Sequence, residues 1–204
     1  MGVARVVVAT ANPDKAREIR AALAESGLEL VDRPGHVPEV QEIGATLVAN
    51  ARLKATALCE ATAMAALADD TGLEVDSLGG APGVWSARYA GERATYAQNV
   101  EKLLAEMSLA MRNARTARFR TAIVLARPDG TELVACGTVE GVIAEVPRGE
   151  GGFGYDSVFV PAAGGGRTFA EMTGAEKQSI SHRGRALRDL VIRLREAAPT
   201  DPEE

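Results

Sequence analysis

The feature that most constrains the fold is a run of mostly β-branched apolar residues near the start of the chain. Residues 3–9 read VARVVVA and continue directly into Thr10-Ala-Asn-Pro13. A strand buried on both faces has this character, whereas a strand with one wet face alternates. Asn12 is a suitable N-cap and Pro13 suits the first helical position, and apolar residues recur at helical spacing until Gly27. The chain therefore begins as strand, tight turn and helix, in a parallel or mixed sheet.

Helices and strands alternate along the rest of the chain. We expect a loop over residues 33–44 and a strand over residues 65–68, followed later by a hairpin over residues 119–146. Three further helices are expected over residues 47–58, 100–107 and 187–194. The hairpin turns at Pro128-Asp-Gly130, and a capping box over residues 173–176 precedes the last helix. Strands both alternate with helices and pair in a hairpin, so the predicted class is α/β with a mixed sheet. We expect one domain over residues 1–196 and a disordered acidic tail over 197–204.

The charge balance argues against nucleic-acid binding. The 204 residues include 23 Lys and Arg against 28 Asp and Glu, a net charge of −5, so no basic excess exists to displace counterions. Cys59 and Cys136 lie far apart and match neither a disulfide framework nor a metal cluster. No stretch approaches the length of a membrane span. We therefore expect a cytoplasmic protein without a nucleic-acid or membrane partner.

The segment TANPDK, residues 10–15, has the composition of a phosphate-binding turn. It places a hydroxyl, an amide, free backbone N–H groups and the Lys15 ammonium at a helix N-terminus, which favours anions. The glycines of a P-loop are absent, and the charge of Asp14 has to point away from any phosphate. Taken alone, such a segment is more often a capped helix with a solvated lysine.

A pair of aspartates follows the apolar stretch 65–68. Neighbouring side chains in extended backbone face opposite sides, so one carboxylate can enter a site while the other fixes a turn. We assign Asp70 to the site and Asp69 to the turn. Mg²⁺ prefers oxygen ligands and keeps several waters, so Asp70 and one distant carboxylate, with Glu42 as the candidate, suffice beside substrate phosphates. The alternative for Asp-Asp-Thr-Gly is a turn closed by an Asx hydrogen bond.

The densest signal is the glycine-rich segment GEGGFGYD, residues 149–156. Its four glycines let the backbone approach a ligand, and Phe153 offers a flat face to a base. The alternative is a glycine-rich hairpin around a core aromatic. Lys177, His182 and Arg183 supply donors to phosphate or carbonyl oxygens, although a lone histidine is more often structural. Arg88 is a secondary candidate for a phosphate contact. The alternative is that the segment WSARY, residues 85–89, forms an aromatic wedge and a salt bridge that hold down the loop GGAPG, residues 79–83.

Five motifs together closely resemble the inosine triphosphate pyrophosphatase (XTP/dITP diphosphatase) family. They are TANPDK, DDTGLEVD, GGAPGVWSARYAG, GGFGYD and SHRG, at residues 10–15, 69–76, 79–91, 151–156 and 181–184. Each motif alone is weak, but their order and spacing over residues 6–194 are specific. The resemblance implies an elongated mixed sheet flanked by helices, in two lobes with a nucleotide cleft between them. It also implies a homodimer that hydrolyses ITP, dITP and XTP to the monophosphate and pyrophosphate with Mg²⁺, which cleanses the nucleotide pool of deaminated purines.

The resemblance also implies roles for individual residues. Glu42 and Asp70 match the metal-binding carboxylates, and Asp70 also matches the group that activates water. The substrate-binding positions correspond to Thr10, Ala11, Asn12, Pro13, Asp14 and Lys15 in the phosphate turn, to Thr71, to Phe153, Gly154, Tyr155 and Asp156 in the base loop, and to Lys177, His182 and Arg183. The preferred bases would be hypoxanthine and xanthine, whose 6-keto group accepts a hydrogen bond where the adenine amino group donates one.

Two departures from the family pattern concern the metal site. Gln41 and Ala49 stand where the family often has glutamates. We expect Glu42 to remain the ligand, while Ala49 removes a carboxylate that would close a capping box with Thr46, a local loss of about 1 kcal/mol. Two rival functions stay open: a pyrophosphatase for pyrimidine or modified nucleotides, and a nucleotide sensor without catalysis. Retention of the base loop argues against the first, and retention of Asp70 argues against the second.

Overall fold

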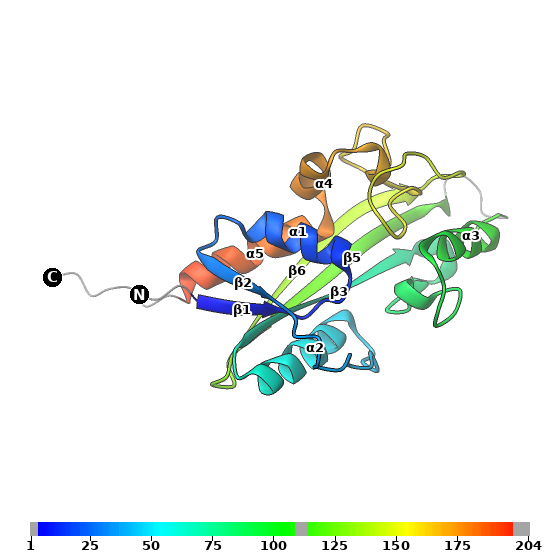
Figure 1. Ribbon diagram of the computed structural model, residues 1–204. Helices are drawn as coiled ribbons and strands as arrows, with labels where there is room; N and C mark the ends of the chain where they lie inside the picture. Colours follow the sequence, from blue (N-terminus) through cyan, green and yellow to red (C-terminus); the bar gives the residue numbers. More distant parts are fainter. Residues whose placement is uncertain (1–3, 109–113, 198–204) are drawn as a thin grey trace.

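The computed structural model describes residues 4–108 and 114–197 (Figure 1). The helices are α1 (Pro13–Leu23), α2 (Leu47–Thr62), α3 (Tyr96–Glu106), α4 (Gly174–Ile180) and α5 (His182–Glu196). The strands are β1 (Ala4–Val8), β2 (Leu28–Asp32), β3 (Ala65–Val75), β4 (Pro82–Gly83), β5 (Thr116–Ala126), β6 (Glu132–Ile143) and β7 (Phe159–Pro161). The predicted tail lies outside the described residues from position 198 onward.

The described strands form one mixed sheet, as predicted. Its order is β2-β1-β3-β5-β6-β7, with β4 paired to β3 at the side. β1 runs parallel to both β2 and β3, while β3, β5, β6 and β7 pair in antiparallel fashion. The predicted hairpin is therefore confirmed as β5 and β6. Strand β1 lies between two neighbours and beneath helices, which is why its residues are almost uniformly apolar.

Helices cover both faces of one half of the sheet. α1 and α5 lie on one face and α2 on the other (Figure 1). Ile19 and Leu187 pack in the core under α1 and α5, and Ala51 and Ala55 pack in the core under α2. The small alanines let α2 approach the sheet closely, which brings the polar side chains on its flank near the strands.

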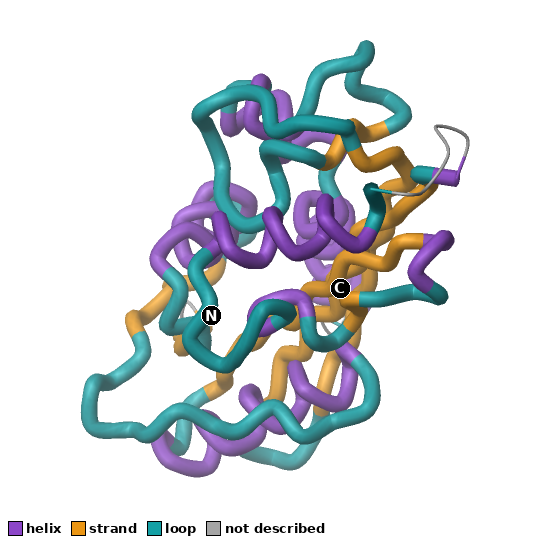
Figure 2. The backbone as a smooth tube through the Cα atoms, turned by 90° about the vertical axis from the view of Figure 1, so that its right-hand side faces the viewer, coloured by secondary structure: helices purple, strands orange, loops and turns teal. Residues whose placement is uncertain are grey.

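Three long strands connect this half to a second lobe. β3, β5 and β6 contribute to the helix-covered cores at one end and to a third core around Phe119, Phe159 and Phe169 at the other. α3 and the loops that follow β6 close this third core. Figure 1 shows α3 at the opposite end of the sheet from β1, and Figure 2 views the molecule from the α3 end. The predicted elongated, two-lobed α/β architecture is confirmed.

The prediction that β3 ends before a turn at Asp69-Asp-Thr-Gly72 is wrong. β3 continues to Val75, and its ladder with β5 pairs Asp70 with Ala122 and Gly72 with Arg120. The glycine serves close packing rather than a turn, because a Cβ on Gly72 would lie 2.6 Å from the carbonyl oxygen of Gly83 in β4. The Asx-turn alternative for this segment is therefore wrong as well.

Several local predictions hold. Asn12 caps α1 with its side-chain oxygen and Pro13 is the first helical residue. Thr173 and Glu176 form the expected capping box of α4. Strands β2 and β7 were not predicted, because they are short edge strands that gain their pairing from distant partners. In the described part of the chain, no helix is both long and apolar enough to cross a membrane.

Candidate active site

Adjacent aspartates of β3 serve two different clusters. Because side chains alternate along a strand, Asp69 faces α1 and α5 while Asp70 faces α2. Asp70 accepts a hydrogen bond from Asn50 (3.3 Å) and one from Lys54 (3.1 Å), both on α2. The predicted division of the pair between two faces is confirmed. Asp69, however, fixes no turn, since the chain is extended there.

Lys54 joins two carboxylates that come from separate parts of the chain. Its Nζ lies 2.7 Å from Glu42 and 3.1 Å from Asp70. Arg88 also holds Glu42, through its carboxylate at 3.0 Å and its backbone carbonyl at 2.9 Å. The Arg88 guanidinium also lies 4.6 Å from the centroid of the Trp85 ring. Arg88 thus makes both the aromatic contact and the salt bridge of the alternative interpretation, and its acidic partner is the predicted site residue Glu42. Two carboxylates share the ammonium of Lys54 in a partly buried setting.

The pKa values of Asp70 and Glu42 are shifted in opposite directions. Burial favours the neutral form of a carboxyl group, and a nearby cation favours the charged form. For Asp70, burial dominates over Lys54 and Lys15, and the Glu42 charge adds to it, so the pKa of Asp70 lies above its ordinary value. For Glu42, burial is outweighed by Lys54 and by the hydrogen bond from Arg88, so its pKa lies below the ordinary value.

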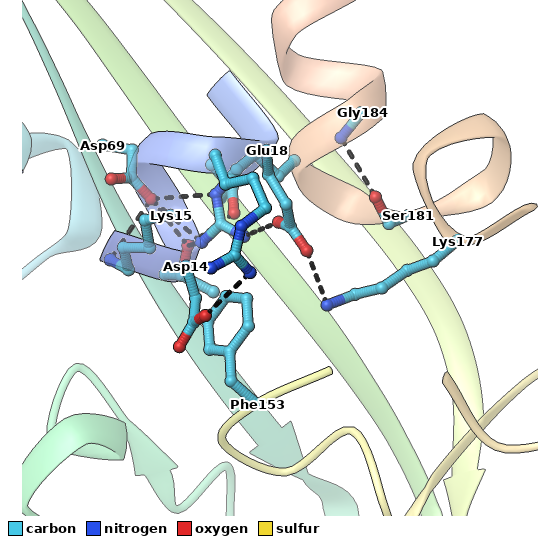
Figure 3. A network of polar contacts seen from close by, with 12 residues as sticks. Asp14, Lys15, Glu18, Asp69, Phe153, Lys177, Ser181 and Gly184 are labelled. Carbon is cyan, nitrogen blue, oxygen red and sulfur yellow. Dashed lines mark hydrogen bonds and ion pairs between the residues drawn. The ribbon is translucent and has the colours of Figure 1, made fainter. Parts of the chain in front are cut away.

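Asp69 is the anchor of a second, cationic cluster. Its fully buried carboxylate contacts Lys15 Nζ at 3.2 Å and accepts hydrogen bonds from Arg183 at 3.0 and 3.2 Å. Figure 3 shows Lys15 of α1 reaching toward Asp69. Burial alone would raise the pKa of Asp69, but Lys15 and Arg183 outweigh it and hold the pKa far below its usual range. Asp69 therefore stays ionised and fixes both cations.

The phosphate turn is capped by Asn12 as its sequence predicts, but the cap occupies backbone N–H groups that were expected to be free. The Asn12 side chain accepts from the backbone N–H groups of Asp14 (2.9 Å) and Lys15 (3.3 Å). Asp14 pairs with Arg17 at 3.1 Å, outside the Lys15–Asp69 cluster. The turn borders a cavity of about 900 Å³. Among its lining residues are Thr10, Ala11, Asn12, Lys15, Glu42, Lys54, Asp69, Trp85 and Arg88. Asp70 is not among the lining residues, but it contacts Lys54, which is.

The glycine-rich loop meets the cationic cluster at Phe153. The Nζ of Lys177 lies 4.5 Å from the centroid of the Phe153 ring. Lys177 also contacts Asp156 at 2.5 Å and Glu18 at 2.7 Å, and Arg183 pairs with Glu18 as well. Figure 3 shows Glu18 of α1 pointing toward Lys177, with Phe153 close by. The loop also lines a second cavity of about 560 Å³ between it and α3.

Three residues that were predicted to contact the ligand, Tyr155, Asp156 and His182, are instead buried and contact other residues of the protein. Asp156 is buried, and it accepts from Lys177 and from the backbone N–H of Phe153. Tyr155 is buried, and its hydroxyl donates to the carbonyl of Ser86 at 2.9 Å. His182 is buried and stacks on Phe119 with ring centroids 4.5 Å apart. Burial, followed by the charges of Arg183 and Lys177, holds the pKa of His182 well below its ordinary value.

Thr71 and Gly154 complete the predicted set. The Thr71 hydroxyl contacts Thr121 at 2.6 Å and accepts from Arg183 at 3.1 Å, so it belongs to the Asp69 cluster. Gly154 has a φ of 62° and lines the second cavity. A positive φ favours glycine, which explains this residue within the loop.

Sequence reasoning missed three residues of this arrangement. Asn50 and Lys54 lie one helical turn apart on α2, beside the apolar stripe, and this i, i+4 spacing was the available signal. Glu18 lies one turn beyond Lys15 on α1. Its partners, Lys177 and Arg183, come from α4 and α5, so nothing in its local sequence identifies it.

The sequence and the fold of this chain are similar to those of known proteins. A family model described as "Ham1 family" matches residues 6–193. A protein named dITP/XTP pyrophosphatase from Streptomyces coelicolor is 48% identical, covering 94% of this chain and 98% of that protein. One of the same name from Escherichia coli is 47% identical, with coverages of 94% and 98%. A HAM1 protein structure from Coxiella burnetii has a TM-score of 0.86 and 39% identity, and the alignment covers 95% of this chain and 100% of that one.

Proposed function

Since this chain belongs to the Ham1 family, we propose that it hydrolyses the triphosphates of non-standard purine nucleosides (ITP, dITP and XTP) to the monophosphate and pyrophosphate. Relatives that match nearly its whole length are named dITP/XTP pyrophosphatase. Four of the five sequence motifs that resemble this family contribute lining residues to the two cavities. The fifth, SHRG, contacts the first cavity through the hydrogen bonds from Arg183 to Asp69. This arrangement supports the transfer of that activity to this chain.

The observation that carries the proposal is the pairing of cations and acids along the larger cavity. Lys15, Lys54 and Arg88 line it, and each is held by a carboxylate. A triphosphate carries several negative charges, and fixed cations in a partly enclosed site stabilise the charge that builds up during phosphoryl transfer. Asn12 already accepts from the N–H groups of Asp14 and Lys15, so α1 contributes the positive end of its helix dipole to the same end of the site rather than free N–H donors.

We assign water activation to Asp70. In the proposed step the water oxygen attacks the α-phosphorus, the bond from that phosphorus to the bridging oxygen breaks, and pyrophosphate leaves. The water proton passes to the Asp70 carboxylate. A base is more effective when its pKa approaches the working pH, and burial raises the pKa of Asp70. Asn50 orients the carboxylate through the hydrogen bond to its Oδ2 atom.

The carboxylates present fit Mg²⁺ as the cofactor. Oxygens of Glu42 and Asp70 converge on one cationic nitrogen, Nζ of Lys54, so the pair already surrounds a positive charge. Mg²⁺ takes oxygen ligands and keeps several waters. The described residues contain no cluster of three or more potential ligand side chains, so substrate phosphates and water would complete the shell. Held by Glu42 and Asp70, Mg²⁺ would offset phosphate charge and polarise the phosphoryl group.

Base discrimination is assigned to the cluster around Phe153. Lys177 has three N–H groups and contacts two acids, Asp156 and Glu18. Arg183 has five and donates to Asp69, Glu18 and Thr71 through four of them. Both cations are buried, and by the described contacts each has one N–H that no protein acceptor takes up. We propose that this N–H donates to the base. A 6-keto oxygen accepts from such donors, whereas an adenine amino group leaves each unpaired at a cost of roughly 1–3 kcal/mol.

The proposal includes a cytoplasmic homodimer. Both cysteines, Cys59 and Cys136, are free thiols in the structure, which suits a reducing compartment. The dimer rests on family resemblance, and the molar mass of the purified protein from light scattering tests it.

Product analysis tests the reaction itself. We expect one dIMP and one pyrophosphate per dITP consumed, without orthophosphate. Asp70→Asn should lower turnover at least about 10³-fold while dIMP binding persists. Asp76 is an exposed aspartate directly after β3, and Asp76→Asn should match the unchanged protein. Stepwise release of orthophosphate would contradict the pyrophosphatase assignment. Turnover by Asp70→Asn above a tenth of the original rate would remove Asp70 from water activation.

A further inference from the structure

Tyr96 connects the phosphate turn to the base loop. Its hydroxyl accepts a hydrogen bond from Nδ2 of Asn12 at 2.7 Å, across 84 positions of sequence. The other end of the same amide, Oδ1, caps α1 through the N–H groups of Asp14 and Lys15. Tyr96 and α1 thus fix both ends of the Asn12 amide.

The ring of Tyr96 lies beside Phe153. Their centroids are 6.0 Å apart with the planes tilted by 42°, and both side chains line the second cavity. Stacked bases lie about 3.4 Å apart, so a base between two rings needs about 7 Å. A base therefore does not fit between the two rings, and both rings line the second cavity as neighbouring surfaces.

The backbone that carries Tyr96 is firmly held. Thr95 and Gln98 form a capping box at the start of α3. The buried Asn99 donates to the carbonyl of Ala87 and accepts from the N–H of Ala90. Val100 packs in the core of the second lobe. Tyr96 itself stays 43% exposed, so a ligand can reach it.

We propose that Tyr96 binds the sugar of the nucleotide. This rests on the proposed function, which puts phosphates at Asn12 and the base at Phe153. The sugar connects those two groups in a nucleotide, and Tyr96 contacts both residues in the protein. Its hydroxyl oxygen is the acceptor toward Asn12, which leaves the O–H proton to donate to a sugar hydroxyl. Its ring packs against the sugar.

Pairing protein and substrate deletions tests the contact directly. Tyr96→Phe removes only the protein hydroxyl. Among the substrates, ITP has both sugar hydroxyls, dITP lacks the 2′ hydroxyl, and 2′,3′-dideoxyITP lacks both. The unchanged protein should lose about 3- to 10-fold in kcat/KM when the bonded hydroxyl is deleted, and Tyr96→Phe should not. A loss between ITP and dITP identifies the 2′ hydroxyl, and a loss between dITP and the dideoxy compound identifies the 3′ hydroxyl. Any factor common to all three substrates reports the lost bond to Asn12.

Two controls separate this role from a structural one. Tyr89→Phe removes a tyrosine hydroxyl that donates to Glu106, away from both cavities, and should respond to the three sugars as the unchanged protein does. Binding of the corresponding monophosphates, followed by fluorescence of Trp85, the only tryptophan in the chain, should repeat the pattern without turnover.

The outcomes distinguish a failure of the Tyr96 proposal from a failure of the proposed pyrophosphatase function. Equal sensitivity to sugar deletion in Tyr96→Phe and the unchanged protein, within twofold, would overturn the Tyr96 proposal and leave the pyrophosphatase intact. Failure of the unchanged protein to hydrolyse or bind any of these nucleotides would overturn both.

Discussion

The Nζ atom of Lys54 lies 3.1 Å from the Asp70 carboxylate, and little of either side chain is exposed to water. The same ammonium lies 2.7 Å from Glu42, so one cation balances two acids that would otherwise repel each other. Burial alone would lower the pKa of Lys54, but Asp70, Asp69 and Glu42 together raise it above its ordinary value. Lys54 is therefore a fixed positive charge at the proposed reaction centre.

Replacing Lys54 should change the pH dependence of turnover. In Lys54→Met, Asp70 and Glu42 face each other without their shared ammonium, so the pKa of Asp70 should rise further. A base acts only when deprotonated, so activity should fall away at a higher pH on the acid side. We expect kcat to fall about 10²-fold at neutral pH. The kcat–pH profile measures both effects.

Lys102→Met is the matched control for that profile. Lys102 lies on α3, where its ammonium donates to the carbonyl of Tyr89, outside the cavity linings. If kcat fell at the same pH on the acid side of the profile in Lys54→Met and Lys102→Met, Lys54 would not set the pKa of Asp70.

Asn50→Ala should destabilise the fold as well as slow the reaction. The buried amide accepts from the N–H of Gly44 at 2.7 Å and donates to Asp70. Truncation leaves a donor and part of a carboxylate unpaired, which lowers the free energy of unfolding by about 1–3 kcal/mol. Urea unfolding measures this, with Gln41→Ala as an exposed-amide control that should stay within about 0.5 kcal/mol. Equal midpoints for the two variants would contradict the role of Asn50.

Local signals in the sequence predict the parts of the site that local chemistry determines. Asn12 and Pro13 start α1 because capping and a fixed φ need no distant partner. Strand alternation separates Asp69 from Asp70 for the same reason. The length of β3 was missed because its continuation past Asp70 depends on pairing with β5, more than 40 residues away. Glu18 and Lys54 were missed because helix packing on the sheet brings their partners to them.

His182 should make stability depend on pH. Because its pKa in the folded protein lies well below 6.5, the unfolded chain binds a proton that the folded chain does not. Stability is then complete above about pH 6.5 and falls as the pH drops below it, by roughly 1 kcal/mol between pH 7.5 and 5.5. Urea unfolding at both pH values should show this loss, and His182→Gln should not.

The chain contains its own control for this titration. His36 is the only other histidine and is exposed, so His36→Gln should keep the full loss of stability between the two pH values. If His182→Gln retained the same loss as His36→Gln, a different group would be responsible.

Gly137 sets how closely α5 approaches β6. A Cβ at this position would lie 2.1 Å from the carbonyl oxygen of His182 and 2.6 Å from the backbone nitrogen of Ala186. Gly137→Ala should therefore push α5 away and cost at least about 2 kcal/mol of stability. Gly174→Ala, in helix α4 with no atom within 4 Å of the added carbon, should be neutral or gain up to about 1 kcal/mol. Thermal unfolding of both variants measures the difference, and equal melting temperatures would contradict the close approach.

The most direct test of the proposed function compares pyrophosphate release from dITP and dATP, side by side, with Mg²⁺ and with the metal chelated. The donors around Phe153 should favour dITP by about 100-fold in kcat/KM, or about 2.7 kcal/mol, and chelation should abolish release from both. Equal turnover of the two nucleotides would contradict base discrimination by Lys177 and Arg183. Absence of pyrophosphate release from dITP, with dITP still bound, would contradict the hydrolytic function itself.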